Sequence, residues 1–117
     1  MTRCYYARAI SLYGTPQSVR DIATLENLGF DVVDPDGAEH EKAYKLCGMR
    51  HFAELVKTCD VVAFRATPGG RIPAGVAHEI GIARDHGINV IELPSSVYSR
   101  TMNIDETREY LREVGHR

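Results

Sequence analysis

One glutamate, Glu79, stands where a parallel α/β protein would carry out chemistry. It follows a buried-strand pattern and a glycine- and proline-rich loop, near the start of a helix whose residues around it are apolar or small. A carboxylate buried there costs free energy unless it is paired or functional. The helix macrodipole favours the ionised form in the first turns. We therefore predict that Glu79 is an ionised nucleophile; the alternative is a solvated helix residue.

Other polar side chains follow the predicted carboxyl ends of neighbouring strands. Arg8 ends the first strand, Asp34 follows the second, and Ser95 follows the last. In an open parallel sheet these ends meet at one edge, where ligands bind. The spacing predicts one pocket containing Arg8, Asp34, Glu79 and Ser95. We expect Arg8 to be exposed, either as a plain surface charge or as a clamp whose forked donors hold a phosphate or carboxylate.

The elements that position these residues alternate along the chain. Short apolar runs predict parallel strands covered on both faces. Thr15-Pro16 has the residues of an N-cap and a first helical position, and Asn103 with Glu106 suits a capping box. We expect strands at 4–9, 30–33, 60–65 and 89–93, and helices from Thr15 to Gly29, from His51 to Thr58, through Glu79 and after Asn103, with modest helical character at 39–47.

This order predicts the fold class. Alternating strands and helices with right-handed crossovers give an α/β, three-layer, flavodoxin-like (Rossmann-like) doubly wound parallel sheet. The 117 residues suffice for a single domain, 1–117, and are too few for two.

Composition narrows the class of partner. Hydrophobic residues make up 44% and charged residues 26% of the chain, which is typical of a soluble globular protein. The net charge of −2 provides no positive field for polymeric nucleic acid or an anionic membrane. No apolar run reaches membrane-spanning length. No His, Cys or Asp spacing suits a metal, so we expect neither metal nor cofactor.

The three cysteines bear on the compartment. Cys4, Cys47 and Cys59 form no CxxC pair, and the N-terminus has no signal-peptide pattern. An odd number of cysteines in such a chain favours reduced thiols and a cytoplasmic location. Cys4 and Cys59 flank apolar strands, where we expect them to act as small hydrophobic side chains.

The helix segment also resembles a known family. Gly75-Val76-Ala77-His78-Glu79-Ile80-Gly81 is similar to a motif of the nucleoside 2-deoxyribosyltransferase superfamily, which includes the 2'-deoxynucleoside 5'-phosphate N-hydrolases. The run 4–10, CYYARAI, is similar to the family's first strand, and the layout covers nearly the whole chain. In this superfamily the glutamate attacks the anomeric carbon of a nucleoside, so the resemblance implies that Glu79 is catalytic.

The resemblance also implies substrate-binding positions, each with a plainer alternative. Tyr5 matches a substrate-shaping tyrosine, or packs in its strand. His78 lies beside the nucleophile, as a pocket wall or a contact to the base. Ser95 resembles a phosphate-holding serine, or lies in a polar turn. Asn103 falls where transferases place an asparagine from a neighbouring subunit, or is a helix cap. Gly75 belongs to the motif. Members of the family complete their pockets with residues from a neighbouring subunit, so the resemblance also implies a homodimer or larger homo-oligomer.

The position of Phe52 departs from the family, as does Arg8, where the family usually has a small residue. An aspartate usual about two helical turns before the third strand is replaced by Phe52, so His51, Asp34 or Asp36 takes its role or the chemistry differs. The loop 68–73 is also longer than usual, and its Pro68-Gly69-Gly70 is similar to the motif of Lonely-Guy-type phosphoribohydrolases, which also cleave an N-glycosidic bond.

Together these features predict an enzyme that cleaves or transfers at the N-glycosidic bond of a (deoxy)nucleoside or nucleoside monophosphate, through a covalent glycosyl-glutamate. It would be a deoxyribosyltransferase or N-glycosidase of nucleotide metabolism. The alternatives are a Lonely-Guy-like phosphoribohydrolase and a non-catalytic nucleotide-binding or sensing module.

Overall fold

A four-stranded parallel sheet in the order β2-β1-β3-β5 forms the centre of the structure. The structure is a computed structural model, and it describes residues 2–94 and 100–115. Tyr5 pairs with Val33 on one side of β1 and with Val62 on the other, and every neighbouring pair in this sheet is parallel. The predicted parallel sheet is confirmed. Its strands are β1 (Arg3–Ala7), β2 (Asp31–Val33), β3 (Val61–Phe64) and β5 (Asn89–Glu92).

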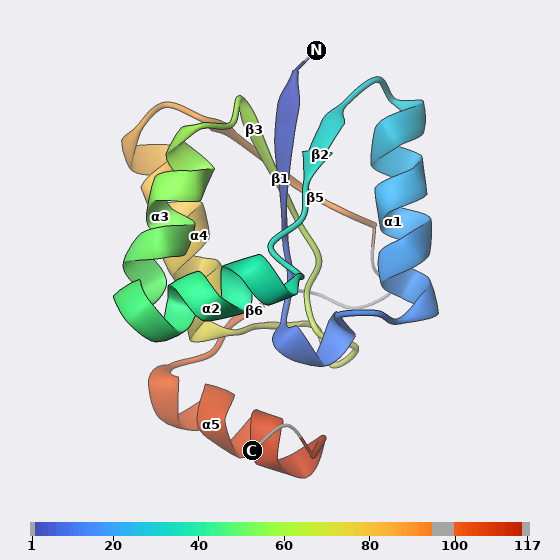
Figure 1. Cartoon of the computed structure of the whole chain (residues 1–117). Coiled ribbons are helices and arrows are strands. Elements are labelled where there is room, and N and C mark those ends of the chain that lie inside the picture. Colours follow the sequence, from blue (N-terminus) through green and yellow to red (C-terminus); the bar gives the residue numbers. More distant parts are fainter. Residues whose placement is uncertain (1, 95–99, 116–117) are drawn as a thin grey trace.

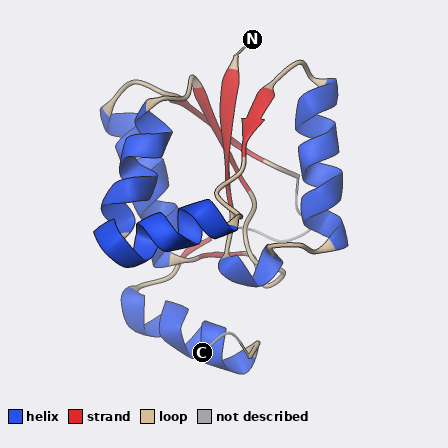
Figure 2. Cartoon of the chain, in the orientation of Figure 1, coloured by secondary structure: helices blue, strands red, loops and turns tan. Residues whose placement is uncertain are grey.

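Helices cover both faces of this sheet, which gives the three layers of a flavodoxin-like α/β fold (Figure 1). One face carries α1 (Pro16–Asn27), and the other carries α3 (Met49–Lys57) and α4 (Ala74–Asp85), as the colouring by secondary structure also shows (Figure 2). Three further elements lie towards the carboxyl ends of the strands: the 3-10 helix η1 (Ile10–Leu12), α2 (Ala38–Cys47) and α5 (Ile104–Glu113).

The two core layers follow from the alternation of side chains along β1. Tyr5 packs with Val56, Val62 and Ile80 under α3 and α4, whereas the next residue, Tyr6, packs on the other face. Successive side chains of a strand point to opposite faces, so two neighbouring tyrosines serve two different cores. Both tyrosine side chains are fully buried. The layer around Tyr6 also contains Cys4, Leu25, Ala63 and Leu93.

Both predicted helix starts are confirmed. Thr15 accepts a hydrogen bond from the backbone N–H of Ser18, with Pro16 at the first helical position of α1. At α5 the side chain of Asn103 accepts from the N–H of Glu106, and the Glu106 carboxylate accepts from the N–H of Asn103. This reciprocal pair is a capping box.

A second, two-stranded parallel sheet was not predicted. It pairs β4 (Arg71–Ile72) with β6 (Arg100–Thr101). Strands of two residues are too short to produce a hydrophobic period, so the sequence pattern gives no sign of them. The sheet continues into a bond from the Met102 N–H to the Ile72 carbonyl, and thereby fixes the start of α5 next to the start of α4.

Within the described residues, no helix combines the length and apolar character that crossing a bilayer requires.

Candidate active site

Glu79 lies inside the protein, paired with a tyrosine of the central strand. Its side chain projects from α4 towards the sheet, and Glu79 is only 6% exposed. The Tyr5 hydroxyl donates a hydrogen bond to Glu79 Oε2. Because Tyr5 lies in the middle of β1 and is fully buried, its hydroxyl has a fixed position. The candidate nucleophile is therefore oriented by the rigid centre of the sheet.

Burial dominates the protonation of Glu79. Burial raises the pKa of Glu79 to about 7, although the Tyr5 hydrogen bond and the positive charge of Arg8 both act to lower it. We expected the helix macrodipole to hold this carboxyl ionised. Burial instead outweighs the macrodipole, because Glu79 is removed from water and is the sixth residue of α4, beyond its first turn. Near neutral pH both protonation states of Glu79 are populated.

Arg8 is buried rather than exposed, which corrects the expectation for a charge at a strand end. It is 3% exposed, and its guanidinium lies between two tyrosine rings, 4.3 Å from the centre of Tyr6 and 4.5 Å from that of Tyr13. Nε donates to Ser18 Oγ at 2.9 Å, and Nη1 donates to Asp34 Oδ1 at 2.8 Å. Stacking and hydrogen bonds to charged partners compensate for the loss of water.

The Arg8–Asp34 pair has a clear structural consequence. Asp34 Oδ1 accepts from Arg8 and also from the backbone N–H of Asp36, so it joins the end of β1 to the loop after β2. Much of the Arg8 charge is already balanced by this carboxylate. Arg8 therefore works first as an organiser of the carboxyl edge, and the expected role as a free phosphate clamp loses support.

Tyr13 is a site residue that the sequence pattern did not single out. It follows η1, its ring covers Arg8, and burial together with the negative charge of Glu79 raises its pKa above the usual tyrosine range. The charges of Arg8 and Asp34 also act on its hydroxyl. Tyr13 therefore lies between the Glu79 and Arg8 parts of the site. Its position depends on the fold of η1, which no periodic pattern announces.

The remaining predicted positions divide into three groups. Gly75 lies in the first turn of α4, where a Cβ would stand 3.7 Å from Met49 Cε, so α3 and α4 approach closely here. His78 is exposed, and Asn103 caps α5, which is the plainer of its two readings. Ser95 lies outside the described residues. The structure thus brings together Tyr5, Arg8, Asp34 and Glu79, and does not place His78 or Asn103 among them.

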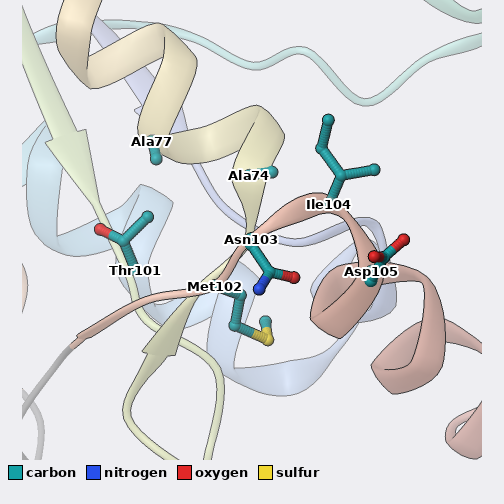
Figure 3. A pocket seen from close by; sticks show the side chains of 7 residues that line it. All are labelled: Ala74, Ala77, Thr101, Met102, Asn103, Ile104 and Asp105. Atoms are coloured by element: carbon teal, nitrogen blue, oxygen red, sulfur yellow. The ribbon is translucent and has the colours of Figure 1, made fainter.

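An open pocket of about 570 Å³ lies beside the same helix but on another side of it (Figure 3). Ala74 and Ala77 line it from α4, and the start of α5 forms the opposite wall. Glu79 does not line it, because positions 77 and 79 point in different directions from a helix. The lining residues of this pocket include no buried carboxylate, so the Tyr5–Glu79 pair is the stronger candidate for the chemical centre. The other lining residues are Thr101, Met102, Asn103, Ile104 and Asp105.

A second buried tyrosine–carboxylate pair lies on the opposite face of the sheet. The Tyr6 hydroxyl donates to Asp21 Oδ2, and Arg65, at the end of β3, donates from Nε and Nη2 to the same carboxylate. Burial acts to raise the pKa of Asp21, but the bonds from Arg65, Tyr6 and Gln17 outweigh it and hold that pKa below its usual range. Asp21 is thus a structural carboxylate whose negative charge is balanced by Arg65. The sequence pattern does not single out Asp21, because it resembles an ordinary residue of α1.

Aromatic packing surrounds Phe52, the position at which the sequence resemblance implies an aspartate. Phe52 is partly buried, with its ring 5.7 Å from that of Tyr44 and 5.1 Å from that of His51. His51 in turn bonds to His40 on α2.

Metal binding gains no support from the part of the chain that the structure describes, where no cluster of three or more His, Cys, Asp or Glu side chains could hold an ion. Cys4 and Cys59 are buried free thiols, as expected for small hydrophobic side chains, and burial raises the pKa of Cys4 to about 11.

No protein-family model matches the chain, and no curated protein matches it.

Proposed function

We propose that this protein cleaves or transfers at the N-glycosidic bond of a (deoxy)nucleoside or nucleoside monophosphate, with Glu79 as the covalent nucleophile. The observation that carries the proposal is the Tyr5–Glu79 pair, a buried carboxylate held by the hydroxyl of a tyrosine in the middle of β1. The resemblance of segment 75–81 to the nucleoside 2-deoxyribosyltransferase superfamily points to the same residue from the sequence.

The chemical step would follow the covalent course of retaining glycosidases. A carboxylate oxygen of Glu79 attacks C1' of the sugar while the bond between C1' and the base nitrogen breaks. The electron pair of that bond leaves with the base, which takes up a proton. A glycosyl ester of Glu79 results. Water then attacks C1' and releases the sugar, or a second base attacks and gives a new nucleoside; both outcomes regenerate the carboxylate.

Four side chains would support this step. The Tyr5 hydroxyl donates a hydrogen bond to the carboxylate and so favours the ionised form that attacks. The positive charge of Arg8 acts in the same direction. Tyr13 and Asp34, which lie around Arg8, would form the wall nearest the sugar.

Base release tests the proposal. The protein is incubated with deoxynucleosides, ribonucleosides and their monophosphates, and free base is measured by chromatography. We expect release from at least one of these substrates, and a loss of several orders of magnitude in Glu79→Gln with much smaller change in substrate affinity, because a covalent nucleophile acts in the transition state. Release at the wild-type rate by Glu79→Gln would refute the assignment.

A non-catalytic nucleotide-binding or sensing module is the second candidate. It is favoured by the environment of Phe52, where tyrosine and histidine rings stand in place of an acid for the leaving base. Nucleotide binding measured by calorimetry without any base release would select this candidate. A Lonely-Guy-like reaction would instead show itself as base release from ribonucleoside monophosphates and not from deoxynucleosides.

A further inference from the structure

Three tyrosines lie in β1 or in the segment that follows it, and they differ in what their hydroxyls contact. The Tyr5 hydroxyl donates to Glu79 and the Tyr6 hydroxyl donates to Asp21, and both tyrosines are fully buried. Tyr13 keeps part of its surface exposed, and its hydroxyl forms no hydrogen bond with another described residue. Of the three, Tyr13 is therefore the tyrosine whose O–H can be offered to a ligand.

Contacts of the ring and of the neighbouring backbone fix the position of Tyr13. Its ring lies on the Arg8 guanidinium, with Cζ of Arg8 4.5 Å from the ring centre. The carbonyl of the preceding residue, Leu12, accepts hydrogen bonds from the hydroxyls of Thr15 and Ser18 at the start of α1. Ser18 also holds Arg8 through Nε. A donor fixed in this way needs little reorganisation when a substrate binds.

The Tyr13 hydroxyl lies within electrostatic reach of the Tyr5–Glu79 pair. Among the charges that act on it, that of Glu79 has the largest effect, ahead of Arg8 and Asp34, and Tyr13 in turn acts on the Tyr5 hydroxyl. Burial and the charge of Glu79 together raise the pKa of Tyr13 above the usual tyrosine range, so the hydroxyl keeps its proton at neutral pH. Near the candidate nucleophile, Tyr13 is therefore a hydrogen-bond donor and not the source of a transferred proton.

A hydrogen-bond donor accelerates the reaction only where negative charge grows as the glycosidic bond breaks. When Glu79 attacks C1', the sugar becomes oxocarbenium-like, so its ring oxygen loses electron density and gains nothing from a donor. The sugar hydroxyls keep nearly the same charge throughout. The base receives the electron pair of the broken bond and becomes a stronger acceptor. The base is thus the part of the substrate that a donor at Tyr13 would stabilise in the transition state.

We propose that Tyr13 is a further catalytic residue, which donates a hydrogen bond from its hydroxyl to the leaving base. The inference rests on the proposed function, because it needs Glu79 to break an N-glycosidic bond. As the bond between C1' and the base nitrogen breaks, its electron pair goes to the base, and the Tyr13 O–H binds the base while keeping its own proton. The base then takes up a proton from water. A base that carries a positive charge beforehand leaves as a neutral molecule and needs this hydrogen bond far less.

Base release by Tyr13→Phe, which keeps the ring on Arg8 and removes only the hydroxyl, tests this role. Each neutral nucleoside that the wild type cleaves is paired with its N-methylated cation on the same sugar, such as guanosine with 7-methylguanosine or cytidine with 3-methylcytidine. Each loss compares variant and wild type on one substrate, so the intrinsic lability of the cation cancels. We expect kcat to fall about 10- to 100-fold for the neutral nucleoside, as for loss of one hydrogen bond to a charged group, and less than about threefold for the cation.

Tyr110→Phe is the matched control. It removes a hydroxyl that lies 2.6 Å from Ser11 Oγ on η1 and leaves the Tyr13 hydroxyl in place, so it should change both rates by the same factor. If Tyr110→Phe showed the same preference as Tyr13→Phe, the position of η1 and not the Tyr13 hydroxyl would be responsible. Equal losses on both nucleosides in Tyr13→Phe, or no loss, would overturn the role of Tyr13 and leave the proposed function standing. A wild type that released no base from any nucleoside would refute the proposed function, and the role of Tyr13 with it.

Discussion

Glu79 reduces the stability of the fold above neutral pH, and this gives the first prediction. Its folded-state pKa of about 7 lies above the ordinary value of 4.5, so the folded protein binds more protons than the unfolded chain between these values. The contribution of protonated Glu79 to stability is then fully present below about pH 4.5 and is lost as the pH rises through about 7. The shift corresponds to about 3 kcal/mol. Glu79→Gln should therefore stabilise the protein at pH 8 and change it little at pH 4.5.

Urea unfolding at the two pH values measures this effect. Asp21 supplies a comparison, because it is a buried carboxylate whose charge is balanced by Arg65 and whose pKa is lowered and not raised. If Glu79→Gln were equally stable or less stable than the wild type at pH 8, the charge on buried Glu79 would not be what destabilises the fold at that pH.

The second prediction concerns the tyrosine that holds Glu79. Tyr5→Phe removes a hydrogen bond that lowers the pKa of Glu79, so that pKa should rise. If base release requires ionised Glu79, its acidic limb should move to higher pH in this variant. The pH dependence of kcat/KM reports the shift in the free enzyme.

Tyr6→Phe is the matched control, because it removes the corresponding hydroxyl on the other face of the sheet. Its partner Asp21 remains bound by Arg65, so the variant should lose about 1 kcal/mol of stability and keep the wild-type pH profile. A similar pH shift in both variants would point to a general effect of the core and not to the Tyr5–Glu79 bond.

How far single residues could be predicted depends on what surrounds them. The burial of Glu79 was predicted because its apolar and small neighbours lie on the same helix. The burial of Arg8 was not, because it depends on two rings and on Ser18 and Asp34, which come from separate segments. A strand end looks exposed in a sequence until the loops that cover it are known.

At the level of elements, the ion pair Asp21–Arg65 joins α1 to the end of β3. We predict that Asp21→Asn destabilises the protein by about 3 kcal/mol, because Arg65 would keep a largely buried charge without its carboxylate partner. Glu54→Gln in α3 breaks an exposed pair with Lys57 and should cost less than about 0.5 kcal/mol. Urea unfolding compares the free energies of unfolding of the two variants. Similar losses would mean that the buried pair stabilises the fold no more than the exposed one.

The elements themselves were predictable where local chemistry decides them. Thr15-Pro16 and the Asn103–Glu106 box act within one helical turn, so the sequence contains all that they need. The strands β4 and β6 were not predictable, because each has two residues and its partner lies about thirty residues away. The position of α5 follows from that pairing and was missed with it.

For the whole molecule we predict a homodimer or larger assembly. The open pocket beside α4 and the exposed side chain of Ile104, 62% accessible, leave an apolar surface around the start of α5. Light scattering should give at least twice the chain mass. Ile104→Asp should shift the equilibrium towards monomer, whereas Val19→Asp, equally exposed on α1, should not. A stable wild-type monomer with full base release would remove this expectation.

The Tyr5–Glu79 bond also provides the protein with an optical reporter. The chain contains six tyrosines and no tryptophan, so tyrosine dominates its near-ultraviolet absorbance. A phenol that donates to a carboxylate absorbs differently from one that faces a neutral carboxyl group, and Tyr5 meets each form on the two sides of about pH 7. A difference spectrum between wild type and Tyr5→Phe, followed across that pH range, would therefore show the charge on Glu79 directly, without substrate or label.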